Sequence, residues 1–386
     1  MSTISNEIFY SVVDANGKDW SGYYYNDGLN KLYDPTNPDL PYQLGYRCVP
    51  VQGIFSCILG KNLWLAKVTL PRDNAEFRMA HYDDLSYKVN MIVVENRYDL
   101  SKLETIEMLV KQGANVCAGN HLAVKWACDN GYLDILKYLV AKGADIHVMH
   151  DSALKDSADH NHSDVMKYLI ENGADIHLDN DYVLCECARH DNLDMVKYLI
   201  KHGAHIHAID DCALRWSAYG GYFDVVKYLV DNGANIYTDD NYVLKCSAMH
   251  GYFDQIKYFI ERMENIDKGY ERALLEAVLH NHWHIVKYLI EHGADIHYNN
   301  DFILYHCAKN GEVDIVKYLV EKGANINADN GRALIIAARV GHIEVVKYLV
   351  NEGADVFQLK GKALRQSIKY RHYDIAKFMM QYYLSE

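Results

Sequence analysis

Apolar and polar residues recur along most of this chain with the spacing of an α-helix, and the whole pattern repeats every 30 residues. In residues 332–361 the apolar positions fall into two segments, 332–339 and 343–351, separated by Val-Gly-His and followed by Gly-Ala-Asp-Val. This order predicts a helix, a tight turn, a second helix and a loop. A Gly-Ala pair follows the second segment in most repeats, starting at Gly113, Gly143, Gly173, Gly203, Gly233, Gly293, Gly323 and Gly353.

Each part of the repeat has a physical reason. Small residues such as Ser157 and Ala158 in the first helix let neighbouring helices approach closely. An acidic residue such as Asp224 stands in the first turn of the second helix, where the helix dipole favours negative charge. The glycine of Gly-Ala suits the left-handed residue that ends a helix. An acid or amide precedes the first helix and is expected to cap its N-terminus, as at Asp151, Asp181, Asp211, Asn241 and Asp301.

The signature GHIEVVKYLVNEGADV at residues 341–356 resembles the ankyrin repeat, which implies helix pairs stacked into a curved array. The usual ankyrin repeat has about 33 residues and opens with Thr-Pro-Leu-His. Here the opening is reduced to Ala-Leu and three residues are missing, so the hairpin-like fingers should be short or absent. The resemblance covers residues 91–386. Its first unit, at 91–121, is degenerate, and the first helix of that unit is expected over 91–100. Full units begin at residue 122, and residues 362–386 form a C-terminal cap.

Residues 1–90 do not repeat and are rich in Tyr, Gly, Asn and Asp. Turn-like and strand-like segments in this region predict a small α+β domain of unknown role. The predicted fold is therefore mainly α: an ankyrin-type helix-turn-helix solenoid of 30-residue units, preceded by this domain. The chain resembles the ankyrin-repeat families of giant viruses such as mimivirus. The resemblance lies in the segments YNDGLN, IFSCI and LWLAKVTLP, followed by repeats with the sequence KYLIENGADIH. That resemblance implies a viral protein that acts inside a host cell.

Composition narrows the possible partners. A formal net charge of −13 argues against nucleic acid, because phosphate binders need clustered Lys and Arg. Nine cysteines recur largely among small core positions, which indicates buried thiols in a reducing compartment. The sequence contains no apolar run near the roughly 20 residues that a membrane span needs. We expect a soluble, monomeric, cytoplasmic protein. If the protein is viral, we expect it in the cytoplasm of the host cell, and the virion is the alternative location.

Candidate chemistry is weak throughout the sequence. The clusters at 160–162 and 280–284 are rich in histidine, but their members recur one per repeat and would be spread along the stack, so no metal site is expected. The loop histidines His147, His177, His207 and His297 are not expected to bind a metal either, since other repeats carry Tyr237, Asp267, Asn327 and Phe357 at this position. No phosphate loop or nucleophile elbow is present, and we expect neither a catalytic residue nor a cofactor. In the first 90 residues His81, Asp83 and Asp84 are available to an enzyme, but we expect them to lie in a solvated loop.

Protein binding is the function that the sequence favours. Ankyrin arrays usually bind partners on the concave face formed by the first helices, where Trp, Tyr and Arg make strong contacts. The alternative for each of these residues is that it fills the gap between neighbouring helices. The expected partner-binding residues are Trp126, Arg215, Trp216, Tyr219, Met249, Leu279, Tyr305 and Arg339.

The predicted protein is thus a non-enzymatic scaffold that binds a host or viral protein. Three alternatives stay open: an adaptor of ubiquitin-ligase type seated in residues 1–90, an unrecognised enzyme in the same region, and a structural component of the virion. The terminal regions carry no convincing F-box-like motif.

One repeat departs from the rule at KYFIERMENID, residues 257–267. Met263 and Glu264 stand where other repeats have Gly-Ala. If Met263 kept the left-handed backbone of that glycine, the strain would destabilise the fold by about 1–2 kcal/mol. Further departures follow at Glu271, Trp283 and His284. The sequence allows either local drift or a changed stacking angle at this seam between repeats.

Overall fold

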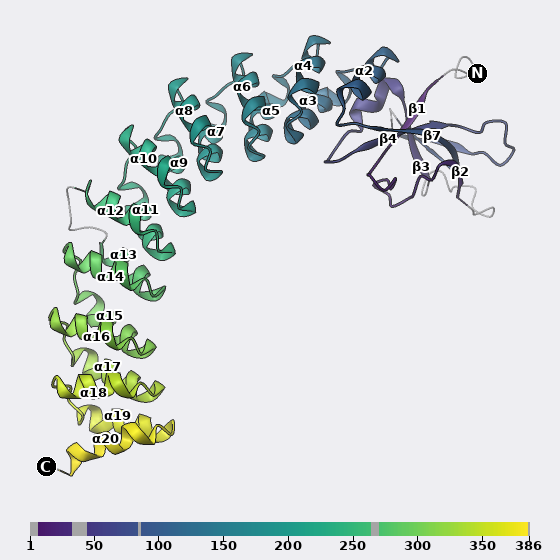
Figure 1. The fold of residues 1–386 in the computed structure, drawn as a ribbon. Coiled ribbons are helices and arrows are strands. Elements are labelled where there is room, and N and C mark those ends of the chain that lie inside the picture. Colours follow the sequence, from purple (N-terminus) through teal and green to yellow (C-terminus); the bar gives the residue numbers. More distant parts are fainter. Residues whose placement is uncertain (1–6, 33–44, 84–85, 264–269, 385–386) are drawn as a thin grey trace. The chain divides into compact units, whose positions relative to one another are not determined.

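The computed structural model describes residues 7–32, 45–83, 86–263 and 270–384, except for the side chains of residues 148–150 (Figure 1). The chain divides into two compact units, named here the N-terminal unit (Met1–Cys187 with Lys197–Ala204) and the C-terminal unit (Ala188–Val196 with His205–Glu386).

An antiparallel sheet opens the N-terminal unit and confirms the predicted α+β region. A 3-10 helix, η1 (Val51–Ser56), joins two of its strands. The strands are β1 (Phe9–Val13), β2 (Gly28–Lys31), β3 (Tyr46–Pro50), β4 (Trp64–Thr69), β5 (Met79–Asp83), β6 (Ser86–Val89) and β7 (Met91–Asp99). Their order across the seven-stranded sheet is β2-β7-β4-β1-β3-β6-β5.

The two faces of this sheet differ in character because successive residues of a strand point to opposite sides. On β3, Tyr46 and Cys48 join the main hydrophobic core of the sheet. Arg47 and Val49, between and after them, line a cavity on the opposite side.

Strand β7 corrects the prediction of a helix over residues 91–100. It pairs with β2 and β4, and its residues Met91, Ile92 and Val94 are buried. The run Met-Ile-Val-Val suits a pleated sheet, and two neighbouring strands are available for it to pair with. The sheet therefore extends past the predicted boundary at residue 90, and the first repeat contributes only its second helix.

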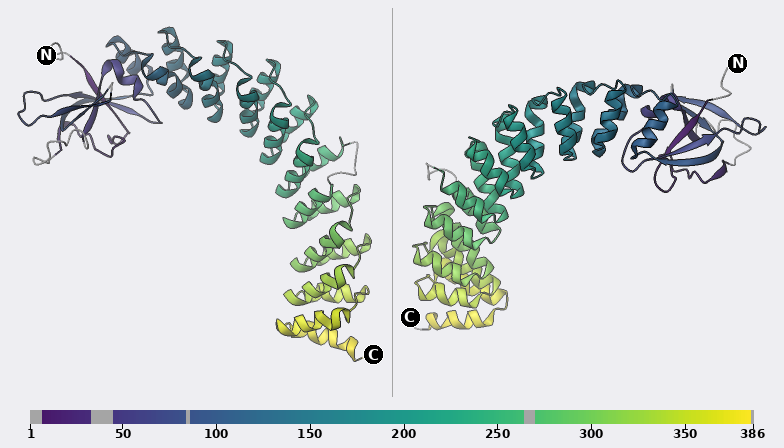
Figure 2. Two further views of the ribbon diagram at one scale, coloured as in Figure 1. Left: turned by 180° about the vertical axis from the view of Figure 1, so that it is seen from behind. Right: turned by 45° about the horizontal axis from the view of Figure 1, so that its top comes forward.

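The remaining described residues form helix pairs with one first and one second helix per repeat, as predicted. The helices are α2 (Leu103–Lys111), α3 (Ala118–Asn130), α4 (Leu133–Ala141), α5 (Val148–Asp159), α6 (Ser163–Glu171), α7 (Leu178–Arg189), α8 (Leu193–Lys201), α9 (Ala208–Gly220), α10 (Phe223–Asp231), α11 (Thr238–His250), α12 (Phe253–Ile260), α13 (Tyr270–Leu279), α14 (Trp283–Glu291), α15 (Tyr298–Asn310), α16 (Val313–Glu321), α17 (Ala328–Val340), α18 (Ile343–Asn351), α19 (Gln358–Lys369) and α20 (Tyr373–Tyr383). In the C-terminal unit the first helices α9, α11, α13, α15, α17 and α19 pack each against the next, as Figure 2 shows from two sides.

Hydrogen bonds join the sheet to the first repeats within the N-terminal unit. The indole Nε1 of Trp126 on α3 donates a hydrogen bond to the carbonyl of Gly60 (3.1 Å). The Tyr10 hydroxyl of β1 donates to Oε1 of Gln112 after α2 (2.6 Å). A Cβ atom on Gly119 would lie 2.8 Å from the backbone at the end of η1, so the chains meet where only glycine fits.

A short left-handed turn precedes most first helices and replaces the hairpin finger. In the repeat that contains α11, Asp239, Asp240 and Asn241 have φ values of 46°, 55° and 61°. Asn, Asp and Gly tolerate this region better than other residues, and these types fill most of the turn positions. From α2 onward the described residues contain no strand, so the predicted loss of the fingers is confirmed.

The acid at the third position of this turn links two repeats. Asp211 is 3% exposed, and its Oδ1 accepts a hydrogen bond from the backbone N–H of Asn235 in the next loop (3.0 Å). The same oxygen lies 3.0 Å from Nδ1 of His207. Asp301 accepts from the N–H of Asn325 in the same way (2.9 Å). These contacts join neighbouring loops, so the capping role expected of this column is replaced by a link between repeats.

The seam at Met263 also differs from expectation. Met263 is not among the described residues with positive φ, whereas glycine at this position in other repeats has φ near 100°, as in Gly233. The strain expected for a left-handed methionine is therefore avoided. Its side chain is buried at 7% exposure, and its N–H donates to the carbonyl of Phe259 (2.9 Å). Glu264 lies outside the described residues.

The link through Asp211 can be tested by substitution. Asp211→Gly removes the carboxylate but keeps the left-handed backbone, since Gly331 and Gly361 occupy this column elsewhere. We expect a loss of about 1.5–3 kcal/mol in the free energy of unfolding, because the backbone N–H of Asn235 loses its hydrogen bond to a charged acceptor. Urea unfolding followed by circular dichroism measures the change.

Asp211→Asn is the matched control, because Asn241 fills the same column and an amide oxygen still accepts the hydrogen bond. It should lose less than half as much stability as the glycine variant. Equal stability of the glycine variant and the native chain would contradict the link.

Candidate functional site

Seven of the eight predicted binding residues lie on the first helices of the C-terminal unit. Three of them are large apolar side chains with the same exposure: Trp216 and Tyr219 on α9 and Leu279 on α13 are each 42% exposed. Tyr219 and Leu279 occupy one repeat position, with the partly buried Met249 of α11 between them. Because α9, α11 and α13 pack in sequence, these side chains form a row on one face of the unit.

Aromatic contacts fix the geometry at one end of this row. The rings of Trp216 and Tyr219 meet edge to face with centroids 6.0 Å apart. Tyr219 meets the ring of His250 in the same manner at 4.9 Å. Edge-to-face pairs are a favourable arrangement that limits the rotation of each ring. We name Trp216, Tyr219, Met249, His250 and Leu279 the aromatic patch.

Trp216 is unusual for its position in the repeat. Most side chains in this column are buried, as in Glu186 (7%), Cys246 (1%), His306 (9%) and Ile336 (9%). The column generally fills the gap between first helices, which is the alternative that the sequence left open. At 42% exposure Trp216 departs from that role, and much of its indole is available to solvent.

Arg215 has an intramolecular role that the sequence did not reveal. Its guanidinium donates to the carbonyls of Ile209 (2.9 Å) and Asp210 (3.0 Å) in the left-handed turn of its own repeat. Ile209 is a β-branched residue with positive φ, a conformation that is normally strained. Arg365, in the same column, donates to the carbonyl of Leu359, which also has positive φ (3.1 Å). Both repeats place an arginine six residues after an apolar residue, Ile209 or Leu359, that is unfavourable in a left-handed turn. This combination is the sequence signal that could have predicted the contact.

Tyr305 and Arg339 lie further along the same face and also contact other side chains of the unit. The guanidinium of Arg332 is 4.1 Å from the ring centroid of Tyr305. The guanidinium of Arg339 is 5.2 Å from the ring centroid of Tyr370. Arg339 is exposed, and Tyr305 is partly buried.

Trp126 corrects the prediction that it binds a partner. It is 3% exposed, donates to the Gly60 carbonyl and meets the ring of Tyr132 at 5.1 Å. A side chain this deeply buried offers no surface to a partner. Gly60, whose carbonyl binds the indole, belongs to the segment that does not repeat. The repeat pattern therefore could not predict this burial.

The turn histidines connect neighbouring repeats. Nε2 of His162 lies 3.1 Å from the carbonyl oxygen of Asp129, at the end of the preceding first helix. His282, His342 and His372 make the same contact with Met249, Lys309 and Arg339. The ring occupies the space beside a glycine of the preceding repeat: a Cβ atom on Gly131 would lie 2.6 Å from His162.

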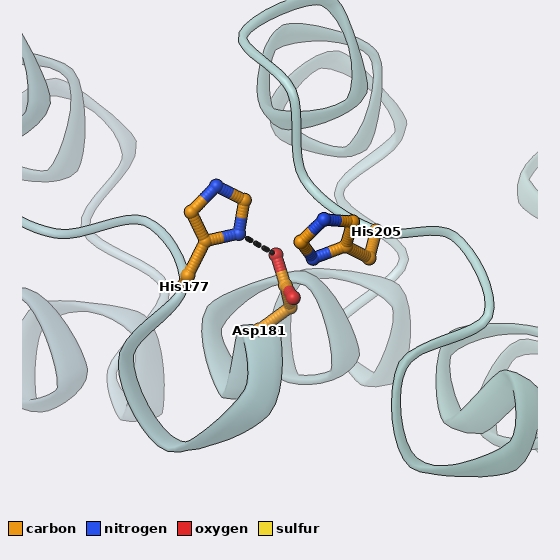
Figure 3. Close-up of side chains that lie close together, drawn as sticks. All are labelled: His177, Asp181 and His205. Atoms are coloured by element: carbon orange, nitrogen blue, oxygen red, sulfur yellow. Dashed lines mark hydrogen bonds and ion pairs between the residues drawn. The ribbon is translucent and has the colours of Figure 1, made fainter.

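The loop histidines pair with the buried or partly buried acids of the left-handed turns. Figure 3 shows the pair His177 and Asp181, whose Nδ1 and Oδ1 atoms are 2.9 Å apart. The corresponding distance is 2.7 Å for His147 and Asp151. His207 and His297 repeat the arrangement with their own aspartates. These histidines therefore take part in the links between loops.

Two of the residues considered for an enzyme in the first 90 positions, His81 and Asp83, lie on strand β5 and not on a loop. His81 is exposed on β5, with its ring 4.5 Å from that of Tyr87. Oδ2 of Asp83 is 2.9 Å from Nη2 of Arg47. Asp84 lies outside the described residues.

The buried cysteines of the repeats are poor nucleophiles. Burial raises the pKa of the Cys187 thiol to about 12, and it also raises the pKa of Cys128 and Cys307. Thiols with such pKa values stay protonated at neutral pH and behave as small apolar side chains.

Among the described helices, none combines the length and the apolar character that a membrane span requires.

Comparison with protein families supports the interpretation of the repeats. The profile described as ankyrin repeats (3 copies) matches residues 154–240, 244–330 and 327–385. The profile of the single ankyrin repeat matches residues 121–151. Together these segments cover more than half of the chain.

Two similar proteins come from Acanthamoeba polyphaga mimivirus, which confirms the predicted resemblance. The ankyrin repeat protein R896 is 34% identical over 117 residues, which are 28% of this chain and 33% of R896. Protein R869 is 32% identical over 116 residues, which are 29% of this chain and 82% of R869. The similarity thus spans a third of the length of R896 and most of R869.

The turn histidines predict a dependence of stability on pH. Burial lowers the pKa of His162 below its ordinary value of 6.5. The unfolded chain therefore takes up a proton at a higher pH than the folded chain, and stability falls as the pH drops below about 6.5. We expect the melting temperature to be lower at a pH of about 5.5 than at about 7.5. Scanning calorimetry at the two pH values measures the difference.

His162→Asn is the control, because Asn192 fills the same column without titrating. The fall in melting temperature should be smaller in this variant than in the native chain. Burial lowers the pKa of His284 in the same direction, so part of the fall should remain. An equal fall in the two proteins would contradict a contribution from His162.

Proposed function

The chain belongs to the ankyrin-repeat family, and from this premise we propose that it is a non-enzymatic scaffold that binds a partner protein through the aromatic patch. Ankyrin repeats bind protein partners, and in such arrays the first helices commonly form the binding surface. The observation that carries the proposal is the exposure of Trp216, Tyr219 and Leu279 in one row.

The composition of the patch suits a binding hot spot. Trp and Tyr are enriched among interface residues whose truncation costs about 2 kcal/mol or more. The rings of Trp216 and Tyr219 are already held against each other, so little rotational freedom remains to be lost on binding. An exposed apolar row of this kind is more typical of an interaction surface than of scattered surface residues.

Charges around the patch indicate the character of the partner. Both signs of charge accompany the row: Lys245 on α11, Glu276 on α13, and Arg215 on α9, whose Nη1 lies 3.5 Å from Oδ2 of Asp239. A partner that inserts an apolar side chain between polar neighbours of both signs would complement this surface. Nucleic acid and lipid are not favoured as partners, and the proposed scaffold needs no cofactor.

The relatives from a virus of Acanthamoeba support a role inside the infected cell. We place the protein in the cytoplasm of the host, as a monomer that binds a host or viral protein. Incorporation into the virion is the second place consistent with this role.

The proposal predicts that the double variant Trp216→Ala with Tyr219→Ala loses its partner while it keeps its fold. Each side chain is 42% exposed and lies at the surface, so the melting temperature should fall only modestly. Tagged native and variant chains are used to capture proteins from Acanthamoeba lysate, and the bound proteins are compared by mass spectrometry. The affinity for a partner captured by the native chain should fall by about thirtyfold or more in the variant, which corresponds to the loss of one hot spot.

Tyr237→Ala is the matched control, because Tyr237 is 41% exposed and lies in a loop outside the patch. This variant should retain the partner. Unchanged capture by the double variant, or equal loss in the Tyr237 control, would contradict binding at the patch.

A further inference from the structure

The repeat formed by α19 and α20 carries an apolar face that the aromatic patch does not include. An open depression of about 550 Å³ on this face is lined by Ile368 of α19, by Tyr373, Met380 and Leu384 along α20, and by Lys377. The four apolar side chains are all exposed, Tyr373 at 65% and Leu384 at 86%. A repeat that caps an array is expected to present a polar outer face, and this repeat does not.

The preceding repeat shows that these positions normally belong to an interface. At three of them the residue one repeat earlier is smaller and buried. The three pairs are Ile368 and Ala338, Met380 and Val350, and Leu384 and Ala354. The repeat of α19 and α20 therefore carries more apolar surface than its neighbour at positions that the neighbour has covered.

The cover in the preceding repeats is a helix. The second helices pack in sequence, α16 against α18 and α18 against α20 (Figure 1). On α20, Tyr373, Lys377, Met380 and Leu384 follow one another at i, i+4, i+7 and i+11, so they form one stripe along the helix. Eleven residues of helix span about 16 Å, and a helix of about three turns with its own apolar stripe would cover this surface.

The surroundings of the stripe are strongly basic, although the whole chain carries a net charge of −13. Residues 358–384 contain one acid, Asp374, and six exposed cationic residues: Lys360, Lys362, Arg365, Lys369, Arg371 and Lys377. In the described part of the chain, no acidic side chain forms an ion pair with Lys369, Arg371 or Lys377. Lys377 lines the depression, and the other two stand next to the turn between α19 and α20. The rim of the apolar face thus carries uncompensated positive charge.

Arg371 occupies a position that disfavours an arginine. Its φ is 65°, and the same column holds Gly, Asn or Asp in the other repeats, as in Gly341 and Asn281. A left-handed backbone is costly for a long side chain. In the preceding repeat, a Cβ atom on Gly341 would lie 2.5 Å from the ring of His372. Arg371 therefore adds a cation to the rim and fills the space where a following repeat with a ring in its turn would pack.

We propose that this face of α19 and α20 binds an amphipathic helix of a partner protein whose apolar stripe is flanked by acidic side chains. The apolar stripe of the partner would cover Tyr373, Met380 and Leu384, and its acids would lie toward Arg371 and Lys377. A second copy of this chain fits less well, because the same cations would meet across the interface. The site is separate from the aromatic patch, which lies on α9, α11 and α13.

Three model peptides test the chemistry of this face on the full chain. The acidic peptide carries leucines on one face of a helix and glutamates on both flanks. The basic peptide has lysines in place of the glutamates, and the third has the acidic composition with its leucines scattered around the helix. A hydrocarbon staple on the polar face keeps each peptide helical, which circular dichroism checks. Fluorescence anisotropy of a label on each peptide measures its affinity.

We expect the acidic peptide to bind at least about tenfold more tightly than either of the others, because only it matches both the apolar stripe and the basic rim. Its affinity should fall as the salt concentration rises, since the rim is exposed. Absence of binding by the acidic peptide, or equal affinity for the acidic and basic peptides, would overturn the proposal.

Variants of the rim separate charge from folding. Arg371→Gly with Lys377→Gln should weaken the acidic peptide by about tenfold. The melting temperature should not fall, because glycine occupies the column of residue 371 in other repeats. Lys317→Glu is the matched control, since Lys317 is exposed in the same column as Lys377 but lies on α16. This variant should keep the preference for the acidic peptide, and a loss equal to that of the rim variant would contradict a local role of the rim.

Variants of the apolar face locate the site. Met380→Ser with Leu384→Ser should abolish binding of the acidic peptide without unfolding the chain, because both side chains are exposed. Trp216→Ala with Tyr219→Ala should leave that binding unchanged. The opposite pattern would place the peptide on the aromatic patch and would contradict the proposal.

Two other occupants are distinguished by direct measurement. Vesicles that contain phosphatidylserine should neither bind the chain nor displace the acidic peptide. Sedimentation should show no dimer that the change of Met380 and Leu384 to serine dissociates. Binding to the vesicles would assign the face to a membrane surface, and such a dimer would assign it to a second copy, so either result would overturn a partner helix as the occupant.

Discussion

The structure of the repeats depends on a buried acid that reaches from one loop to the next. Asp211 and Asp301 stand at the end of left-handed turns, and each accepts the backbone N–H of a loop in the following repeat. A hydrogen bond to a charged acceptor contributes about 1.5–3 kcal/mol, so this contact fixes the distance between neighbouring loops. Once the loops are fixed, the first helices pack closely, and the side chains on their outer face are presented in rows.

Much of the fold could be predicted from the sequence because the repeat supplies the same evidence many times. The bounds of α17 and α18 agree with the two apolar segments found in residues 332–361. The repeat also placed Tyr219, Met249 and Leu279 at one position of successive helices. Such a position occupies the same face of each helix, and so the row follows from periodicity alone.

What the sequence could not supply were contacts made by unique residues. Trp126 and Trp216 share a column, yet one is 3% and the other 42% exposed. The difference arises at Gly60, in the segment that does not repeat, whose carbonyl binds the indole of Trp126. Likewise, β7 is a strand because β2 and β4 offer partners for it, and local propensity does not reveal such partners.

The central claim is that the first helices of the C-terminal unit bind the partner. Site-specific photo-crosslinking tests this most directly, with p-benzoylphenylalanine placed either at Tyr219 on α9 or at Lys227 on α10 of the same repeat. Both positions are exposed, but they lie on the first and the second helix respectively. The account predicts a discrete crosslinked product in Acanthamoeba lysate from position 219 and none from position 227. A product from position 227 alone, or from neither position, would contradict it.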